Sequence, residues 1–352
     1  MKAITHDRYG SPNTLELRDL RAPAIGDTDV LIRANAASLH PGDLFSVLGS
    51  PFPVRLMTGL RRPKIGIPGY DVAGTIEAVG PAVTHLRAGD EVFGVGIGAC
   101  AELVRAKAEL VVPKPPALSF EEAAAILTSA LAAFHGLRDA GKLQPGQRVL
   151  INGASGGVGS FAVQIAKVLG AEVTGVCSTA NVEMVRSLGT DHVIDYTRQD
   201  FTAGPDRYDL ILDNVENRRL SHVRRALTPR GTLVLNSGTG ATGLRMLGRL
   251  LWPLILSPFI SHNLRRYVSN PKRSDLEWLA ERAVEGSLRP IIGSTYALRA
   301  TPTALRLIET GHSRGKVVVK IVPSREPATA SITRTAEAHG DLPPARELAD
   351  VR

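Results

Sequence analysis

The feature that most constrains the fold is a glycine-rich turn, GASGGVG at residues 153–159, between a predicted strand and a predicted helix. The strand is Arg148–Asn152, and the helix covers residues 160–169. In this context glycines let main-chain N–H groups approach a pyrophosphate, and the positive end of the helix faces that charge. A tight turn without a ligand is the alternative. The turn predicts a dinucleotide site, with the pyrophosphate against Ser155, Gly156, Gly157, Val158 and Gly159.

Strands and helices alternate on the C-terminal side of this turn, as in a doubly wound parallel sheet. The further strands are predicted at residues 172–176, 193–194, 208–212 and 232–235. Before the turn, Gly, Pro and Asp punctuate short strands, which indicates a barrel or small sandwich. Ser119 and Glu122 form a capping box that opens a helix from residue 123 to about residue 137. We therefore expect an α/β protein with a β-rich domain at residues 1–122 and a nucleotide-binding domain at residues 123–288.

The rest of the chain is less regular. Residues 244–260 form an apolar insert with flanking arginines, too short for a membrane span. The insert has three interpretations. It forms a cleft lid that selects an apolar substrate, it makes a subunit or domain contact, or, less expected, it makes a peripheral membrane contact. A helix follows at residues 275–285 and a closing strand at residues 317–322. The composition of residues 323–352 predicts a disordered tail.

Composition excludes several classes of protein. The chain has 352 residues, 43% of them hydrophobic, which rules out disordered, collagen-like and coiled-coil proteins. Two cysteines cannot build a disulfide framework, and the N-terminus has no secretory signal, so we expect a cytoplasmic protein. The net charge of +8 comes from residues 218–273, with eleven Lys or Arg and no acid. Since no nucleic-acid motif accompanies these charges, we expect no nucleic-acid partner.

The residues after the second strand of the sheet indicate which dinucleotide fits. An NAD site carries an Asp or Glu there to accept from the ribose 2′-OH, but residues 177–181 (CSTAN) contain no acid. Ser178 and Asn181 can face a 2′-phosphate, and Arg314 or Lys316 could reach it from the C-terminal part of the chain, so NADPH is the expected cofactor. Further cofactor contacts are expected at Tyr196, Asn214, Val215, Ser237 and Gly238.

Three more motifs accompany the glycine turn, namely GYDVAG at residues 69–74, GDEVFG at 89–94 and VQIAK at 163–167. Together they closely resemble the medium-chain dehydrogenase/reductase superfamily over residues 1–322, and within it the zinc-independent quinone oxidoreductases and enoyl reductases. The resemblance implies a GroES-like catalytic domain from residues 1–122 and 289–322 around a Rossmann domain. It also implies NADPH in the cleft and a homodimer.

The zinc ligands of related alcohol dehydrogenases are absent from the matching positions. His40 stands at the first, Tyr70 and Asp71 stand where the family has Gly-His-Glu, and the Thr128-Ser129 region offers no cysteine for the last. A catalytic zinc needs three good ligands around an open position. We therefore expect no metal.

Without a Lewis acid, hydride must go to a carbon already polarised by conjugation, in an apolar quinone or an enone or enoyl C=C. By resemblance, His40 and Asp43 line the nicotinamide pocket. The His40 imidazole can donate to the substrate oxygen or supply a proton near neutral pH, or it is packed in its turn for structure alone. Tyr70 is a further donor or a core tyrosine.

Two other functions stay open at this point. One is a non-enzymatic NADPH sensor or structural protein, which would keep the glycine turn and lose the catalytic pocket. The other, within enzymes, is an alcohol or carbonyl dehydrogenase. His40 and Asp43 argue against the first of these.

Overall fold

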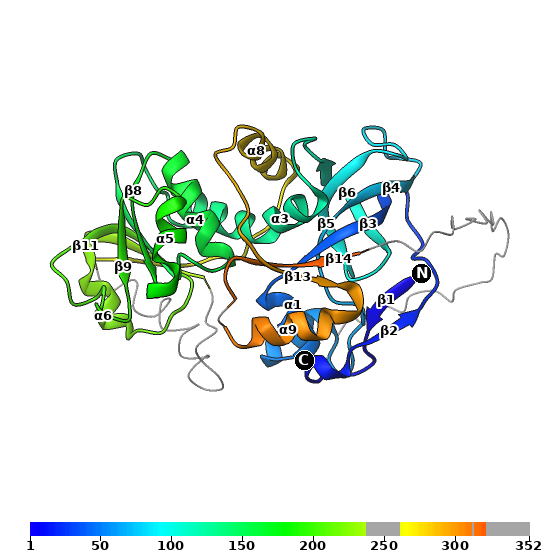
Figure 1. Cartoon of the computed structure of the whole chain (residues 1–352), viewed down its shortest axis with the longest axis horizontal. Helices are drawn as coiled ribbons and strands as arrows, with labels where there is room; N and C mark the ends of the chain where they lie inside the picture. The colour runs from blue at the N-terminus through cyan, green and yellow to red at the C-terminus, as the bar shows by residue number, and fades with distance from the viewer. Residues whose placement is uncertain (237–260, 312, 322–352) are drawn as a thin grey trace, which may run out of the picture.

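A computed structural model describes residues 1–236, 261–311 and 313–321 of the chain. The molecule has two lobes side by side, one built around a parallel sheet and one rich in antiparallel strands (Figure 1). The expectations for Ser237, Gly238, the insert at residues 244–260 and the tail at 323–352 lie outside the described residues. Within the described part, the α/β fold class is confirmed.

The β-rich lobe contains β3 (Asp29–Leu39), β4 (Asp71–Val79), β5 (Glu91–Ile97), β6 (Leu103–Pro113), β13 (Ile292–Ala297) and β14 (Lys316–Lys320). Its sheet order is β13-β14-β3-β4-β5-β6, and β3 also pairs with β6, which closes the four strands from β3 to β6 into a barrel. β14 runs antiparallel to β3, so the C-terminal strands extend a sheet made by the N-terminal part of the chain. A hairpin-like pair, β1 (Lys2–Thr5) and β2 (Glu16–Asp19), completes the described strands of this lobe.

The other lobe contains β7 (Arg148–Asn152), β8 (Glu172–Cys177), β9 (His192–Asp195), β10 (Tyr208–Asp213), β11 (Leu227–Leu235) and β12 (Asn263–Arg266). All of these strands are parallel, in the order β12-β11-β10-β7-β8-β9. This is the doubly wound Rossmann order: β8 and β9 are added on one side of β7, and β10, β11 and β12 are then added on its other side. The helices that pack against this sheet are α4 (Gly157–Val168), α5 (Val182–Ser187) and α6 (Leu220–Arg225), whereas α8 (Arg273–Val284) contacts β6 of the barrel.

A long helix, α3 (Phe120–Phe134), joins the two lobes and continues as a π-helical turn over His135–Ala140. It begins at the expected capping box: the Ser119 hydroxyl accepts from the Glu122 N–H at 3.2 Å, and the Glu122 carboxylate accepts from the Ser119 N–H at 2.9 Å. Because these bonds satisfy N–H groups that a helix start leaves unpaired, the start is fixed locally.

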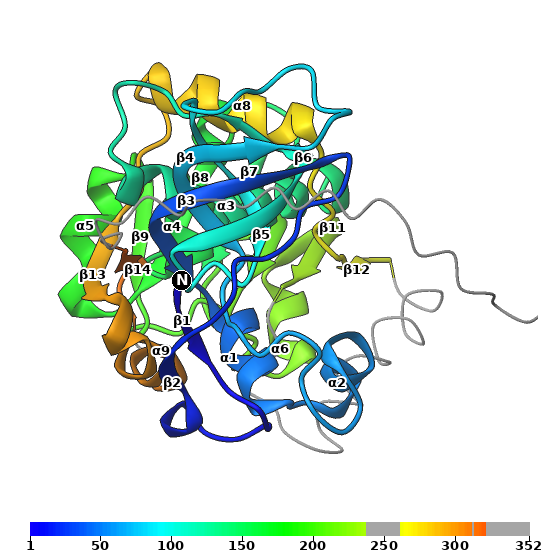
Figure 2. The same ribbon diagram turned by 90° about the vertical axis from the view of Figure 1, so that its right-hand side faces the viewer.

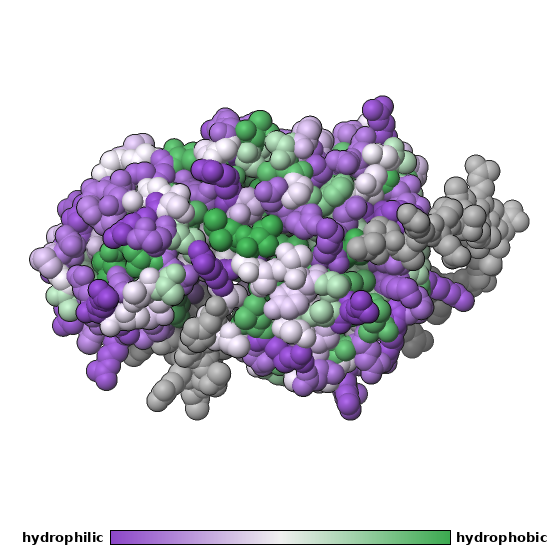
Figure 3. All heavy atoms as spheres, viewed as in Figure 1, coloured by the Kyte–Doolittle hydropathy of each residue, from purple (hydrophilic) through white to green (hydrophobic). Residues whose placement is uncertain are grey.

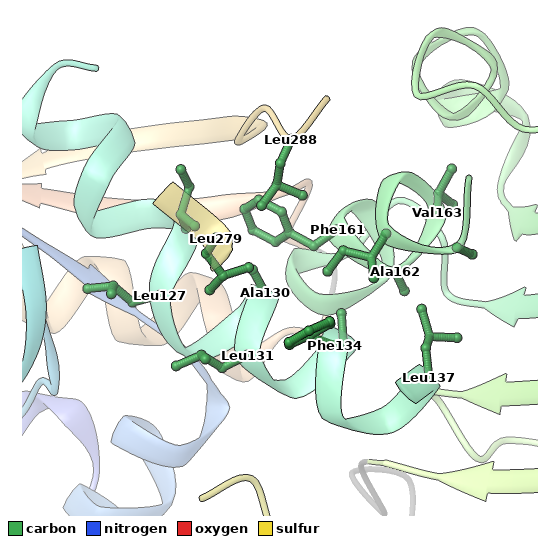
Figure 4. Close-up of a cluster of buried hydrophobic side chains, with 14 of the residues drawn as sticks. Leu127, Ala130, Leu131, Phe134, Leu137, Phe161, Ala162, Val163, Leu279 and Leu288 are labelled. Carbon is green, nitrogen blue, oxygen red and sulfur yellow. The ribbon is translucent and has the colours of Figure 1, made fainter. Parts of the chain in front are cut away.

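The largest hydrophobic core lies around α3 and reaches into both lobes. Leu127 and Leu131 of α3 are buried together with Phe161 of α4 and Leu279 of α8 (Figure 4). The same core includes Phe93 of the barrel. α3 therefore packs against the strands of the barrel and against α4 of the other lobe, so that one helix connects the two.

Some elements differ from the sequence predictions. α4 begins at Gly157 and not near residue 160, so the last glycines of the turn already belong to the helix. β12 was not predicted because it has four residues, two of them arginines, and is recognised only by its pairing with β11. Three helices of the β-rich lobe were also missed, α1 (Pro41–Leu48), α2 (Phe52–Thr58) and α9 (Thr301–Glu309).

The surface is mostly polar. On the face drawn in Figure 3, hydrophobic side chains gather in small patches, the largest near the middle where the lobes meet. None of the helices in the described part of the chain is long and apolar enough to cross a membrane.

Candidate active site

His40 and Asp43 are held at the point where β3 ends and α1 begins. His40 is the N-cap of α1: its Nδ1 accepts from the Gly42 N–H at 3.0 Å, and the Asp43 carboxylate accepts from the His40 N–H at 2.8 Å. The two side chains thus form a capping box with histidine in place of the usual hydroxyl residue. Local backbone chemistry positions both of them.

The capping bond also decides the tautomer of His40. Since Nδ1 accepts a hydrogen bond, the proton of the neutral ring lies on Nε2. Burial lowers the pKa of His40 to about 4, so the ring is neutral at pH 7. Its Nε2 is buried and has no hydrogen-bond partner among the described residues. His40 is therefore a hydrogen-bond donor at neutral pH, and burial moves its pKa away from the near-neutral value that the sequence analysis expected for a proton source.

A second buried pair lies behind His40. Lys316, the first residue of β14, places its ammonium 3.7 Å from Asp71 Oδ2 and donates to Ser129 Oγ at 2.8 Å. Asp71 Oδ1 accepts from the main-chain N–H and the hydroxyl of Thr128. Burial raises the pKa of Asp71 and lowers the pKa of Lys316. The Lys316 charge opposes the first shift, and the Asp71 charge opposes the second. Lys316 was expected at the 2′-phosphate; its ammonium lies instead in this buried cluster.

Four buried polar atoms in this region lack a hydrogen-bond partner. They are Ser38 Oγ, His40 Nε2, Asp43 Oδ1 and Asp71 Oδ2, out of six such atoms in the whole described part of the chain. Ser38 faces Asp71 across the β3–β4 pairing. Burial raises the pKa of Asp43 to about 7. The hydrogen bond from the His40 N–H and the charge of Lys316 act in the opposite direction and lower this pKa, but burial has the larger effect. Buried polar atoms need partners, so this cluster has the character of a site for water or a polar ligand group.

Tyr70 lies beside His40 on the side of the solvent. The two rings stack with 6.2 Å between centroids and 15° between planes, and Tyr70 is 36% exposed. The alternative of a core tyrosine therefore does not hold. Burial of part of the ring and the charge of Asp43 raise the pKa of Tyr70, which keeps its hydroxyl protonated at neutral pH.

The positions at which related dehydrogenases hold zinc do converge here, but their side chains do not suit the metal. Asp71 already binds Thr128, Ser129 already binds Lys316, and the Lys316 ammonium stands beside the remaining carboxylate oxygen. A fixed cation at that distance opposes a second one. Within the described residues there is no group of three His, Cys, Asp or Glu side chains that could hold a metal ion.

The glycine turn has the geometry of a phosphate cradle. Gly153 has a φ of +79°, which favours glycine, and a Cβ on Gly159 would lie 2.0 Å from the Gly153 carbonyl oxygen. Gly156 caps α4 without any side-chain bond to its first N–H groups, and no acid lies in its first turn. These N–H groups are therefore free to bind an anion. A Cβ on Gly157 would lie 3.4 Å from both Lys316 Cδ and Ser129 Oγ, so the cradle adjoins the buried cluster.

The turn is also tied to the C-terminal part of the chain. The Gly315 N–H donates to the carbonyl of Ser155 at 2.9 Å, and Gly315 forms a bridge with Gly156. Arg314, one residue earlier, has an exposed side chain. Of the two basic residues expected from this segment, the structure thus leaves Arg314 exposed next to the glycine turn and buries Lys316.

At the other end of the expected dinucleotide, Ser178 and Asn181 lie together after β8, with the Asn181 amide donating to Ser178 Oγ at 3.0 Å. Asp195, at the end of the neighbouring strand β9, was not predicted from the sequence. Its carboxylate accepts from the hydroxyls of Thr179 at 2.5 Å and Thr197 at 2.8 Å, and these bonds lower its pKa. This acid comes next to the turn after β8 only because β9 pairs with β8, which sets Asp195 opposite Cys177.

Basic and aromatic groups surround the same end. Arg198 lies 3.8 Å from Asp195, with its side chain 79% exposed, and Tyr196 between them in the sequence is also exposed. Arg186, the nearest arginine along the sequence, is paired with Glu183 at 2.7 Å. Arg198 is therefore the arginine best placed to meet an added anion here.

Asn214 and Val215 form a rim next to the glycine turn. The Asn214 amide donates to the Asn152 carbonyl at 3.1 Å and accepts from the Asn236 amide at 2.7 Å. A Cβ on Gly153 would lie 2.7 Å from a methyl group of Val215. The structure thus brings these two residues to the carboxyl end of β7, where a doubly wound sheet binds its ligand.

Family models match both lobes. Residues 26–116 match the alcohol dehydrogenase GroES-like domain, and residues 188–319 match the domain described as zinc-binding dehydrogenase. The second match does not contain any of the positions compared with zinc ligands above, since these lie before residue 188.

Known proteins resemble the chain over nearly its full length. A 2-methylene-furan-3-one reductase from Solanum lycopersicum is 31% identical over 92% of this chain and 80% of its own. The structure of a quinone oxidoreductase from Coxiella burnetii superposes with a TM-score of 0.80 at 31% identity, covering 92% of this chain and 99% of that one. A mycobacterial protein complexed with NADPH gives a TM-score of 0.76 at 26% identity, covering 91% and 99%. The chain therefore belongs to the medium-chain dehydrogenase/reductase superfamily, in the branch of quinone oxidoreductases and enoyl reductases, and is a nicotinamide-dependent oxidoreductase.

Proposed function

We propose that this protein is an NADPH-dependent reductase that works without a metal and reduces an apolar quinone or an activated C=C bond. The observation that carries the proposal is the Nε2–H of His40, a buried donor that lies 3.6 Å from Asp43 Oδ2 and has no hydrogen-bond partner among the described residues. Its cluster adjoins the glycine turn through Lys316 and Ser129. A polar donor with no partner at the edge of a dinucleotide cradle is suited to the oxygen of a conjugated acceptor.

The residues that would hold the cofactor fit a dinucleotide. The first N–H groups of α4 face the pyrophosphate, and Asn214 and Val215 border the nicotinamide end. For the 2′-phosphate, Ser178, Asn181 and Arg198 supply donors and charge, while the acid Asp195 is engaged by two threonine hydroxyls. This balance favours NADPH over NADH. The mycobacterial relative complexed with NADPH supports the same choice.

When bound, NADPH supplies a hydride to the electron-poor carbon of the substrate. His40 Nε2–H then donates to the substrate oxygen, where negative charge develops as the hydride arrives. Since its ring stays neutral at pH 7, His40 orients and stabilises without giving up its proton. When Asp43 is protonated, its proton lies on Oδ1, because Oδ2 already accepts from the His40 N–H. Asp43 is therefore the group that holds an exchangeable proton next to the site near pH 7.

The substrate class rests on what similar proteins reduce. The tomato relative is named as a reductase of a methylene furanone and the Coxiella protein as a quinone oxidoreductase. Both names describe acceptors polarised by conjugation, which need no Lewis acid. A homodimer and a cytoplasmic location stay predictions of the sequence.

The test is NADPH oxidation against benzoquinones, naphthoquinones, enals, enones and enoyl thioesters, with product analysis and metal analysis of the purified protein. We expect turnover with at least one of these classes and no stoichiometric metal. The His40→Gln variant, which keeps a donor without the imidazole, should retain more activity than His40→Leu. Binding of NADPH without turnover on the whole panel would support a sensor, and oxidation of simple alcohols dependent on zinc would support an alcohol dehydrogenase; either result contradicts the proposal.

A further inference from the structure

The segment at residues 52–65, α2 and the loop after it, exposes an unusual amount of hydrophobic surface. Phe52, Leu56, Met57, Leu60 and Ile65 are between 50% and 83% exposed. They make up five of the twelve large hydrophobic side chains exposed in the described part of the chain. Single exposed hydrophobic residues are ordinary, but a group of them rimmed by polar residues marks an interaction site.

The same segment is strongly basic. Arg61, Arg62 and Lys64 are exposed, and none of them has an ion-pair partner within the ranges that the structure describes. No Asp or Glu occurs between Asp43 and Asp71, so the segment has no acid of its own to neutralise them. Elsewhere on the surface arginines are commonly paired, as Arg18 is with Asp7 and Arg138 with Asp139. The hydrophobic group is thus flanked by unneutralised positive charge.

The segment is held in place by hydrogen bonds. The Tyr9 hydroxyl donates to the Gly59 carbonyl at 2.5 Å and contacts Thr58 Oγ1 at 2.8 Å. Arg55 donates to the Gly49 carbonyl at 2.8 Å and lies over the Tyr9 ring at 4.8 Å. The Lys64 N–H donates to the Thr58 carbonyl at 2.7 Å. The hydrophobic side chains are therefore presented from an ordered backbone, so little conformational entropy is lost when a partner covers them.

The position of the segment links it to the candidate active site. α2 packs against α1, which carries Asp43 in its first turn, and the chain after the segment leads to Tyr70 and Asp71. Figure 2 shows α2 at the edge of the β-rich lobe, beside α1 and outside the barrel. A surface that covers residues 52–65 would thus lie against the helix that begins at His40 and carries Asp43.

We infer that residues 52–65 dock the protein onto an anionic lipid surface, with Phe52, Leu56, Met57 and Leu60 entering the interface and Arg61, Arg62 and Lys64 meeting the lipid headgroups. Hydrophobic side chains flanked by cations are the combination that binds a protein in the plane of such a membrane. A second copy of the chain fits less well, because a two-fold contact through this face would bring its unpaired cations together. The inference extends the proposed function, since a lipophilic acceptor would enter from the bilayer.

The test is flotation of the full chain with vesicles of phosphatidylcholine alone and with 30% phosphatidylglycerol. We expect binding to the anionic vesicles only. Each cation near an anionic surface contributes about fivefold in affinity, so Arg61→Gln/Arg62→Gln should weaken binding about thirtyfold. Leu56→Ser/Met57→Ser should weaken it at least about tenfold with the charges intact. The matched control is Arg225→Gln/Arg230→Gln, which removes two exposed cations from the Rossmann lobe and should bind like the wild type.

Three results would overturn the inference: no binding to anionic vesicles at low salt, equal binding by all the variants, or a fall in solution mass for the α2 variants, which would make the occupant a second copy. NADPH oxidation with a water-soluble quinone should be unchanged in these variants, which excludes misfolding. Since vesicle binding is measured without substrate, failure of the docking surface and failure of the proposed reductase activity are separate results.

Discussion

Replacing Lys316 with methionine is the most informative perturbation of the buried cluster. The Lys316 ammonium lies 3.7 Å from Asp71 Oδ2, and both side chains are almost completely buried. Two unit charges at that distance interact by about 4.5 kcal/mol at an effective dielectric constant of about 20. Breaking a buried pair by removing one partner costs about 3–5 kcal/mol, because the other charge is left uncompensated. We therefore expect Lys316→Met to lower the free energy of unfolding by about 3–5 kcal/mol.

A double-mutant cycle separates the pair from general packing. Asp71→Asn removes the opposite charge and keeps an acceptor for Thr128, so the double variant buries no unpaired charge. We expect the free energy of unfolding of the double variant to be at least about 2 kcal/mol higher than the value obtained by adding the two single effects. The measurement is urea unfolding of the apo-protein at pH 7, followed by circular dichroism.

The matched control is Lys320→Met on the same strand. Lys320 pairs with Glu121 at 3.0 Å, but its side chain is 59% exposed, so its loss should cost less than about 1 kcal/mol. The reasoning is refuted if Lys316→Met costs no more than Lys320→Met. Additive single effects, within about 0.5 kcal/mol, would show equally well that the two charges are not coupled.

Three other predictions concern the proton, the cradle and the 2′-phosphate. Burial raises the pKa of Asp43 from 3.8 to about 7, so its stabilisation is present below pH about 4 and is lost as the pH rises through 7. The free energy of unfolding of Asp43→Asn, measured with urea and relative to that of the wild type, should therefore rise by about 4 kcal/mol between pH 4 and pH 8. Parallel curves of stability against pH for the two proteins would contradict this. Gly159→Ala, whose Cβ would lie 2.0 Å from the Gly153 oxygen, should lose at least about tenfold in NADPH affinity by calorimetry, whereas Gly204→Ala, with its nearest neighbour at 3.9 Å, should not. Arg198→Ala should raise the KM for NADPH about tenfold and leave that for NADH unchanged; an equal effect on both would exclude a 2′-phosphate contact.

Features that depend on neighbours in the sequence were predictable. The capping box at Ser119 and Glu122 and the glycine turn after β7 are local, because their hydrogen bonds and backbone angles involve residues within a few positions. The alternation of strands and helices likewise predicted the parallel sheet. β12 escaped prediction for the same reason, since a short strand rich in arginine has no local signal and forms only by pairing with β11.

The chemistry of the site depended on contacts across the chain. Lys316 and Ser129 are 187 residues apart in the sequence, and only the pairing of β14 with β3 and the packing of α3 bring them together. The sequence could not show that burial keeps His40 neutral, nor that its Nδ1 is used to cap α1. The first follows from the removal of water around the ring by residues far away in the sequence, and the second from a local hydrogen bond that is not recognisable in the sequence because histidine is an unusual cap.

The amino-acid sequence by itself determined that the chain has a Rossmann lobe with a phosphate cradle, because glycine geometry and strand–helix alternation are properties of short segments. The tertiary structure alone decided that an ammonium, Lys316, stands beside the Asp71 carboxylate, that the ring of His40 is buried, and that residues 52–65 expose hydrophobic side chains next to cations. Charge state and exposure depend on which groups exclude water from one another, and those groups come from distant parts of the chain.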